Sequence, residues 1–321
     1  MNMKLTSFLA AICVLLAGLL CLYAFRFSRV QADLADAETR LSEAEAENRA
    51  AKIEGDALRR SLDGALQDGK ALRDELAEAS AAARALPAEE PADIQPTLSV
   101  RNGSLTEHAL VTPHLEAFRY LLYDPGISAS EPLPLLLFLH GSGGCGKDIE
   151  DVFSDDTLPT MLQRGWLSPD ALVLIPQCPG DSWDPYCEDL MALVEYVTAS
   201  SGADPDRISL TGFSLGGIGC FTLLCRYPDF FSAAMPISAV CEEPSACAVI
   251  TSTPVRILHG EKDSVMESRY VVLANDIINA AGGKSTLTFL PGEGHFIQQH
   301  YLDDGGEPIQ WLITQRRSAG G

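Results

Sequence analysis

Basic residues are scarce in this sequence of 321 residues. Lysine and arginine total 23 against 44 aspartates and glutamates, which gives a formal net charge of −21 and a pI near 4.5. A nucleic-acid-binding surface needs clustered basic side chains to neutralise phosphates, so the composition argues against that class of partner. The chain is 46% hydrophobic, which is typical of a folded protein, and is long enough for one large domain with accessory segments.

The sequence also lacks the cysteine and histidine spacings that are typical of zinc sites. Its nine cysteines include no C-x-x-C pair. Seven cysteines lie beyond the apolar amino-terminal segment, and an odd number cannot all pair within one chain. If the domain is exported, a disulfide of Cys178 with Cys187 or of Cys241 with Cys247 stays open, whereas Cys220 and Cys225 are expected to be small buried residues. We therefore expect no resident metal ion.

One loop has the letters of a nucleotide site without its partners. The stretch LLLFLHGSGGCGKD contains G-x-G-x-x-G at Gly141, Gly143 and Gly146. A dinucleotide site needs an acidic residue about twenty positions later at the end of a strand, and the corresponding strand ends IPQCPG. A phosphate-binding P-loop needs Gly-Lys followed by Ser or Thr, whereas Asp148 follows Lys147 here. We therefore predict no nucleotide cofactor.

The amino terminus is a separate apolar segment. Phe8 to Phe25 are eighteen residues without a charge, closed by Arg26 and Arg29. A helix of this length rises about 27 Å, close to the thickness of a hydrocarbon core. Residues 1–30 are therefore predicted to be an uncleaved signal anchor, and a signal peptide cleaved near Ala32 is the alternative.

Residues 31–86 are rich in Ala, Glu and Leu and contain no proline. Two rows of positions seven residues apart, which start at Leu34 and Ala37, are filled mainly by leucine and alanine. This repeat predicts a coiled-coil stalk that makes a homo-oligomer, interrupted by Gly55 and Gly69; a single solvated helix or a charged spacer is the alternative. The proline-containing residues 87–98 are predicted to be a linker, and residues 99–317 the main domain.

Apolar runs alternate with helical patterns in the main domain. This alternation predicts an α/β fold with a mostly parallel sheet covered by helices on both faces. Functional side chains are then expected on loops at the carboxyl ends of the strands. The expected strands are 118–123, 133–139, 171–175, 207–211, 233–237, 255–258 and 286–290, and the expected helices are 187–199, 215–226, 267–281 and 308–315.

The segment RISLTGFSLGG predicts a nucleophile. Ser214 is the centre of a G-x-S-x-G motif between an expected strand and an expected helix, where small residues leave room for a sharp turn that exposes the hydroxyl. A serine of this kind needs a base and an orienting acid. His295, on the loop after the last strand, is the predicted base, with His300 as the second choice.

Asp263 is the predicted acid, since it lies in the loop that follows the preceding strand, and Glu261 in the same loop is the rival. His259 is expected to pack at the end of that strand. One oxyanion donor is predicted to be the backbone N–H of Leu215, directly after the nucleophile.

The order Ser214, Asp263, His295 on alternating strands and helices resembles the α/β hydrolases. The segments PLLLFLHGSGGCGKD, LIPQCPGDSWD, DPDRISLTGFSLGG, HGEKDSV, GEGHF and WLITQRR resemble the esterase group that includes polyhydroxybutyrate depolymerase-like, feruloyl esterase-like and dienelactone hydrolase-like enzymes and bacterial "predicted peptidases". The resemblance implies an α/β-hydrolase fold in which Ser214, Asp263 and His295 are catalytic. It also implies that the second oxyanion donor is the N–H of Ser142, with Gly141 or Gly143 next.

Two further residues are candidates for the substrate pocket. Cys145 belongs to the stretch Gly143-Gly144-Cys145, in a loop where many relatives carry charged residues. Trp183 in the SWDP segment could wall an acyl or alcohol site, with packing at a core edge as the alternative. The sequence therefore predicts a serine esterase acting on a small or polymer-linked ester, anchored in a membrane with its domain outside the cytoplasm. A peptidase or phospholipase-like activity on the same triad is one alternative, and a non-catalytic binding module on a stalk is another.

Overall fold

The computed structural model describes residues 97–98, 102–146, 148–154 and 156–317. The chain divides into two compact units, residues 1–89 and 90–321, and only the second contains described residues. The predicted anchor at 1–30, the predicted stalk at 31–86 and most of the predicted linker lie outside the described ranges. Within those ranges, no helix combines the length and apolarity that a membrane crossing requires.

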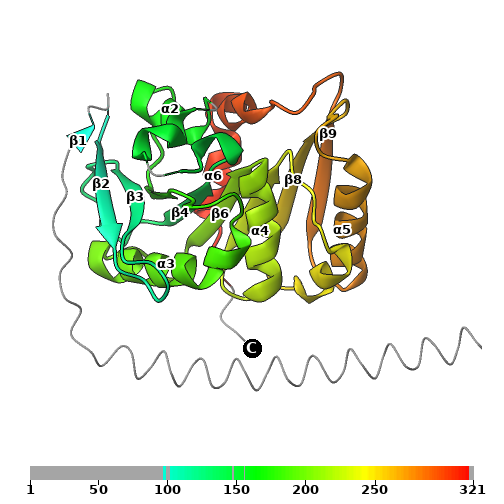
Figure 1. Cartoon of the computed structure of the whole chain (residues 1–321), viewed down its shortest axis with the longest axis horizontal. Helices are drawn as coiled ribbons and strands as arrows, with labels where there is room; N and C mark the ends of the chain where they lie inside the picture. Colours follow the sequence, from blue (N-terminus) through cyan, green and yellow to red (C-terminus); the bar gives the residue numbers. More distant parts are fainter. Residues whose placement is uncertain (1–96, 99–101, 147, 155, 318–321) are drawn as a thin grey trace, which may run out of the picture. The chain divides into compact units, whose positions relative to one another are not determined.

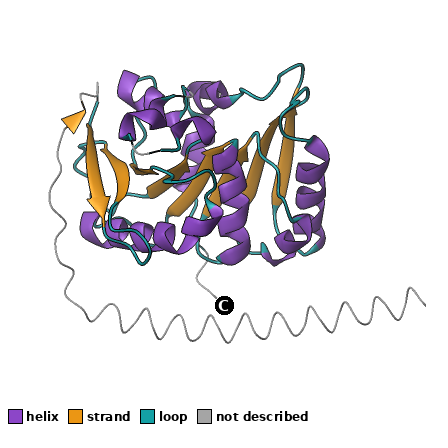
Figure 2. Cartoon of the chain, in the orientation of Figure 1, coloured by secondary structure: helices purple, strands orange, loops and turns teal. Residues whose placement is uncertain are grey.

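Nine strands form one sheet in the described part of the chain, in the order β1-β2-β3-β5-β4-β6-β7-β8-β9 (Figures 1 and 2). The pairs from β1 to β5 along this order are antiparallel, and every pair from β5 onward is parallel. The strands are β1 Thr97–Leu98, β2 Ser104–Leu110, β3 Phe118–Asp124, β4 Leu135–Leu139, β5 Leu172–Pro176, β6 Ile208–Phe213, β7 Ala233–Ile237, β8 Val255–Gly260 and β9 Ser285–Leu290. The predicted α/β fold with a mostly parallel sheet is therefore confirmed.

Helices cover both faces of this sheet (Figure 2). The α-helices are α2 Leu158–Arg164, α3 Cys187–Ser201, α4 Leu215–Arg226, α5 Ser268–Ala280 and α6 Glu307–Thr314. Short 3-10 helices η1 Ser142–Gly144, η2 Ile149–Phe153, η3 Asp184–Tyr186, η4 Pro244–Val249 and η5 Gln298–Gly305 lie in the connections. Helices α2 and α3 each end at a glycine in the left-handed conformation, the usual way for a chain to leave a helix.

Strand β4 shows how the sheet separates two hydrophobic cores. Leu135, Leu137 and Leu139 pack with α3, α4 and α5 on one face, whereas Leu136 and Phe138 pack with α2 and α6 on the other. Side chains alternate between the two faces of a strand, and a strand buried on both faces therefore has a continuous apolar sequence. This burial fixes β4 in the middle of the sheet. It therefore also fixes where the loop after β4 begins, at the carboxyl ends of the parallel strands.

Two strands, as well as α2 and the short 3-10 helices, were not predicted from the sequence. Strand β2 pairs along its whole length with β3, from Ser104 opposite Asp124 to Leu110 opposite Phe118. Its sequence SLTEHAL mixes polar and apolar residues, as expected for a strand near the edge of a sheet that is only partly buried. Thr97 and Leu98, which the sequence assigned to the linker, instead pair with β2 as β1.

Candidate active site

The parallel strands bring four separate loops to one edge of the sheet. Leu139 at the end of β4 is paired with Gly212 on β6, and Gly260 at the end of β8 is paired with Leu290 at the end of β9. Loops that follow neighbouring parallel strands leave the sheet at the same edge. The loop after β4, the turn after β6 and the loops after β8 and β9 therefore meet, and they carry all the residues predicted for the oxyanion hole and the triad.

Ser214 lies in a strained turn between β6 and α4. Its backbone has φ 54° and ψ −117°, a region that a residue with a side chain adopts at a cost of roughly 1–3 kcal/mol. A Cβ atom on Gly216 would lie 1.9 Å from the carbonyl oxygen of Leu139, and one on Gly212 would lie 2.5 Å from the carbonyl oxygen of Gly216. The two glycines thus allow the close approach of backbones that holds Ser214 in this turn.

The structure brings Ser214, His295 and Asp263 into one chain of hydrogen bonds. His295 Nε2 lies 2.8 Å from Ser214 Oγ, and His295 Nδ1 lies 2.8 Å from Asp263 Oδ2. An ionised carboxylate can only accept, so Nδ1 carries the proton and Nε2 is free to accept the serine hydroxyl. This tautomer is the one in which a histidine can take a proton from serine.

The Asp263 carboxylate is held by donors on both oxygens. Oδ1 accepts the backbone N–H groups of Val265 at 2.8 Å and Met266 at 2.9 Å, while Oδ2 accepts from His295. Burial alone would raise the pKa of Asp263, but the bonds from Met266, His295 and Val265 outweigh it and leave the pKa below its usual value. Asp263 is therefore ionised and positioned to stabilise a protonated His295.

The loops that carry the acid and the base are joined along their backbones. The N–H of Lys262 donates to the carbonyl of Glu293 at 2.7 Å. A Cβ atom on Gly260 would lie 1.9 Å from the carbonyl oxygen of Gly294, so glycine is required at this crossing. Glu261, the rival acid, accepts the N–H of Gly292 through its carboxylate at 2.8 Å and thus braces the same pair of loops.

Two other histidines lie near these loops but outside the hydrogen-bond chain. His300 contacts Asp303, with His300 Nδ1 2.6 Å from Asp303 Oδ2. His259 is fully buried, and its Nε2 lies 3.2 Å from the carbonyl oxygen of Met266. Burial lowers the pKa of His259 against the opposing effect of Asp263, so it packs as a neutral ring beneath the acid loop.

The loop after β4 is built around His140. Its ring is buried, Nε2 accepts the N–H of Cys178 at 2.9 Å, and Nδ1 donates to the carbonyl of Gly141 at 2.7 Å. Burial lowers the pKa of His140 to about 4, so the ring is neutral at neutral pH. A Cβ atom on Gly144 would lie 2.4 Å from this ring, which explains the glycine there. His140 thus shapes the loop and is not a metal ligand.

The two predicted oxyanion donors lie at equivalent positions after neighbouring strands. Ser142 is three residues beyond Leu139 and Leu215 is three beyond Gly212, and Leu139 and Gly212 are paired in register. Leu215 begins α4 and Ser142 begins η1, so the N–H groups at both positions belong to the first turn of a helix. First-turn N–H groups have no partner within their helix and are available to an anion.

Two residues that support this site were not identified from the sequence. The Ser238 hydroxyl, after β7, donates to the carbonyl of His295 at 2.6 Å. The Gln177 side chain donates to the carbonyl of Gly144 at 3.3 Å and to that of Asp148. Each acts through contacts between loops that are distant in the sequence, and the only local signal was the position of Ser238 and Gln177 just after a predicted strand.

The predicted pocket residues have different surroundings. Trp183 is 1% exposed, and its Nε1–H donates to the carbonyl of His140 at 3.2 Å, with the two rings 4.9 Å apart. These are the contacts of a residue that supports the loop from the core. Cys145 is half-buried at the end of η1. The roles of Trp183 and Cys145 in binding substrate stay predictions.

Comparison with known proteins gives the same group as the sequence motifs. Residues 181–313 match the Phospholipase/Carboxylesterase family. The esterase candidate NocK of Nocardia uniformis subsp. tsuyamanensis is 28% identical over 167 residues, which cover 48% of this chain and 47% of NocK. The esterase YpfH of Escherichia coli (strain K12) is 26% identical over 123 residues, which cover 38% of this chain and 52% of YpfH. The chain thus spans about half the length of both relatives.

The crystal structure of a thermostable esterase shares the fold. It is 25% identical to this chain with a TM-score of 0.55, and the match covers 66% of this chain and 63% of that one. The resemblance to the α/β-hydrolase esterase group, predicted from the sequence motifs, is confirmed by these comparisons.

Proposed function

We propose that this chain is a serine hydrolase of carboxylic esters. The premise is that residues 99–317 form a domain of the α/β-hydrolase esterase group. The observation that carries the proposal is the unbroken hydrogen-bond chain from the Ser214 hydroxyl through His295 to Asp263. A binding module on a stalk does not require a strained serine, a correctly protonated histidine and an ionised carboxylate in one line. The same three groups are what acyl transfer requires.

In the first half of the reaction, the ester is cleaved and the serine is acylated. Ser214 Oγ attacks the carbonyl carbon, and its proton passes to His295 Nε2 over the 2.8 Å hydrogen bond. The carbonyl oxygen becomes an oxyanion, which the N–H groups of Leu215 and Ser142 stabilise, each by roughly 3 kcal/mol. Asp263 stabilises the imidazolium, which then gives its proton to the leaving alcohol as the C–O bond breaks.

In the second half, water replaces the alcohol. His295 takes a proton from the water, the resulting hydroxide attacks the acyl carbon, and the same two N–H groups stabilise the second oxyanion. When this intermediate collapses, His295 returns its proton to Ser214 Oγ and the carboxylic acid leaves. The enzyme is regenerated without a metal ion or cofactor.

Exposed apolar side chains next to the triad favour a substrate with an apolar part. Phe296 is 63% exposed and its ring centre lies 5.4 Å from that of His295. Val265, whose N–H binds Asp263, is 61% exposed. Large apolar side chains exposed beside a catalytic histidine are suited to contact an acyl chain or an apolar alcohol. Peptide amides and phospholipids are the competing substrates on the same triad.

The test is labelling with a fluorophosphonate, together with hydrolysis of nitrophenyl esters of short and long acyl chains. The wild-type chain should be labelled, and Ser214→Ala should lose labelling and at least about 10⁴-fold of its esterase activity. Ser200→Ala, an exposed serine on α3, should change neither. Absence of labelling in folded wild-type protein would refute the enzyme and favour the binding module. Faster cleavage of a peptide amide or a phospholipid than of any nitrophenyl ester would replace the proposed substrate class.

We also propose that residues 1–30 anchor the chain in a membrane, that residues 31–86 form an oligomeric stalk, and that the hydrolase domain lies outside the cytoplasm. The support is the charge-free run from Phe8 to Phe25 and the seven-residue repeat that follows it. Membrane fractions washed with alkaline carbonate should retain the chain. Sedimentation of residues 31–321 should show an oligomer that is lost when 31–86 are deleted, and a monomer in both cases would reject the stalk.

A further inference from the structure

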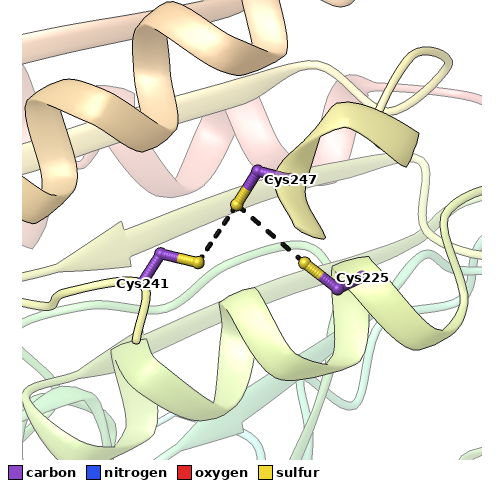
Figure 3. A group of neighbouring side chains, drawn as sticks. All are labelled: Cys225, Cys241 and Cys247. Carbon is purple, nitrogen blue, oxygen red and sulfur yellow. Dashed lines mark hydrogen bonds between the residues drawn. The ribbon is translucent and has the colours of Figure 1, made fainter. Parts of the chain in front are cut away.

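Three cysteine side chains from separate segments meet on the α4 side of the sheet (Figure 3). Cys225 lies in the last turn of α4, Cys241 follows β7, and Cys247 lies in η4. Cys247 Sγ is 3.1 Å from Cys241 Sγ and 3.9 Å from Cys225 Sγ, and all three sulfur atoms lie within 4.8 Å of one another. None of the three belongs to the triad or to the loops that carry the predicted oxyanion donors.

The cluster lies between the core and an open cavity. Cys241 and Cys247 are buried, whereas Cys225 is half-buried. Cys225 and Cys241 line a cavity of about 670 Å³, together with Glu242 and Glu243. The cavity therefore reaches two of the three cysteines, and two glutamates are among the residues that line it.

We propose that Cys225, Cys241 and Cys247 bind a thiophilic divalent cation of the zinc class, with a fourth coordination position facing the cavity. Three sulfur ligands select soft and borderline ions over magnesium or calcium. Binding replaces three S–H bonds by three metal–sulfur bonds and releases three protons to solvent. Water or a carboxylate from the cavity wall completes the tetrahedral coordination that zinc prefers.

The sulfur spacing fits this assignment. Ligands about 2.3 Å from a shared zinc ion in tetrahedral geometry lie roughly 3.8 Å apart, close to the 3.9 Å between Cys225 and Cys247. Cys241 and Cys247 have to separate by roughly 0.7 Å, which a small rotation of one side chain provides. A disulfide between Cys241 and Cys247 would use two sulfurs and leave the third without a function, whereas a metal ion uses all three.

The test is a cobalt titration of the full-length chain, purified in detergent with a phosphine reductant and freed of metal. Cobalt bound by thiolates absorbs in the near ultraviolet, and this absorption should saturate at one equivalent per chain and disappear when zinc is added. Cys225→Ser should weaken cobalt binding at least ~10-fold, because even residues that only support metal ligands have effects of that size. Cys187→Ser, a buried cysteine outside the cluster, should bind cobalt as the wild type does.

Circular dichroism checks that each variant is folded, and Cys241→Ala provides a second test if Cys225→Ser does not fold. Absence of the thiolate band at excess cobalt would overturn the proposal. Unchanged binding in folded Cys225→Ser and Cys241→Ala would overturn it as well. So would a Cys241–Cys247 disulfide found by peptide mass in chain whose thiols were blocked at cell lysis, because that bond consumes two ligands. None of these outcomes depends on esterase activity.

Discussion

His140 and His295 lie in loops at the same edge of the sheet, and each has a partner at both ring nitrogens. The partners of His140 are the backbone groups of Gly141 and Cys178. The partners of His295 are side chains, a carboxylate that can hold a counter-charge and a hydroxyl that can lose its proton. The ring of His140 is therefore held by backbone groups alone, whereas the ring of His295 has the partners that a proton carrier needs, and the difference lies in whether those partners can titrate.

Of the substitutions that test this difference between the two histidines, Asp263→Asn should cause the largest loss of esterase activity. The amide cannot act as an anion, and its NH₂ group favours the tautomer of His295 in which Nε2 carries the proton, so the ring no longer accepts from Ser214. We expect nitrophenyl ester hydrolysis to fall on the order of 10⁴-fold while the chain stays folded. Glu261→Gln, in the same loop, is the control and should keep activity within about tenfold. Similar losses in both variants would reject Asp263 as the specific partner of His295.

Ser238→Ala should have the next largest effect, because it removes the hydroxyl that fixes the backbone of His295. A small displacement of a catalytic group can cost up to about 10²-fold, and we expect kcat to fall by roughly 10- to 100-fold with KM almost unchanged. Ser232 lies at the opposite end of β7, is also buried, and donates its hydroxyl to the carbonyl of Ile208 at 3.0 Å.

Ser232→Ala is therefore the matched control for Ser238→Ala. Each variant removes one hydroxyl hydrogen bond to a backbone carbonyl, and the carbonyl of Ile208 keeps the N–H of Ser232 at 2.7 Å, so each should lose only about 1 kcal/mol of the free energy of unfolding. Only Ser238→Ala should lower kcat. An equal loss of activity in the two variants would show that Ser238 acts through general stability and does not position His295.

The smallest predicted effect is the contribution of His140 to the pH dependence of the free energy of unfolding. Its pKa is about 4 in the folded chain and about 6.5 when unfolded, so below pH 6.5 the unfolded state binds a proton that the folded state does not. Its contribution is therefore complete above pH 7 and falls as the pH decreases toward 4. Between pH 7.5 and pH 5.5 the free energy of unfolding should decrease by about 1.4 kcal/mol more in wild type than in His140→Asn. Equal pH dependence in urea unfolding of the two proteins would contradict the assignment.

The central sheet and the candidate triad could be predicted from the sequence because their signals are local. Apolar runs such as Leu135–Leu139 are strands buried on both faces, and the glycines on either side of Ser214 mark a turn that few other residues allow. Chain order limited the acid to the loop after β8 and the base to the loop after β9, with Glu261 and His300 as rivals there, and the structure brings Asp263 and His295 together with Ser214.

The supporting contacts could not be predicted in this way, because they join residues that are far apart in the chain. Ser238 and His295 are separated by 57 positions, and Cys225 approaches Cys247 across 22. The cysteines have no zinc-like spacing in the sequence, and they meet only because α4, the segment after β7 and η4 pack around one point. Strand β2 was missed for a related reason, since its mixed sequence forms a strand by pairing with β1 and β3.

The crossing at Gly216 has a consequence for how this domain can diverge. The backbone at Gly216, just after the Ser214 turn, lies against the backbone of Leu139 at the start of the loop after β4. There is no space between them for one added carbon atom. The two halves of the predicted oxyanion hole can therefore be neither separated nor tilted by substitutions within that contact. Changes in substrate preference are instead expected from exposed side chains next to the triad, such as Val265 and Phe296. An engineer who wants a new ester specificity should randomise those positions and leave the glycine crossing intact.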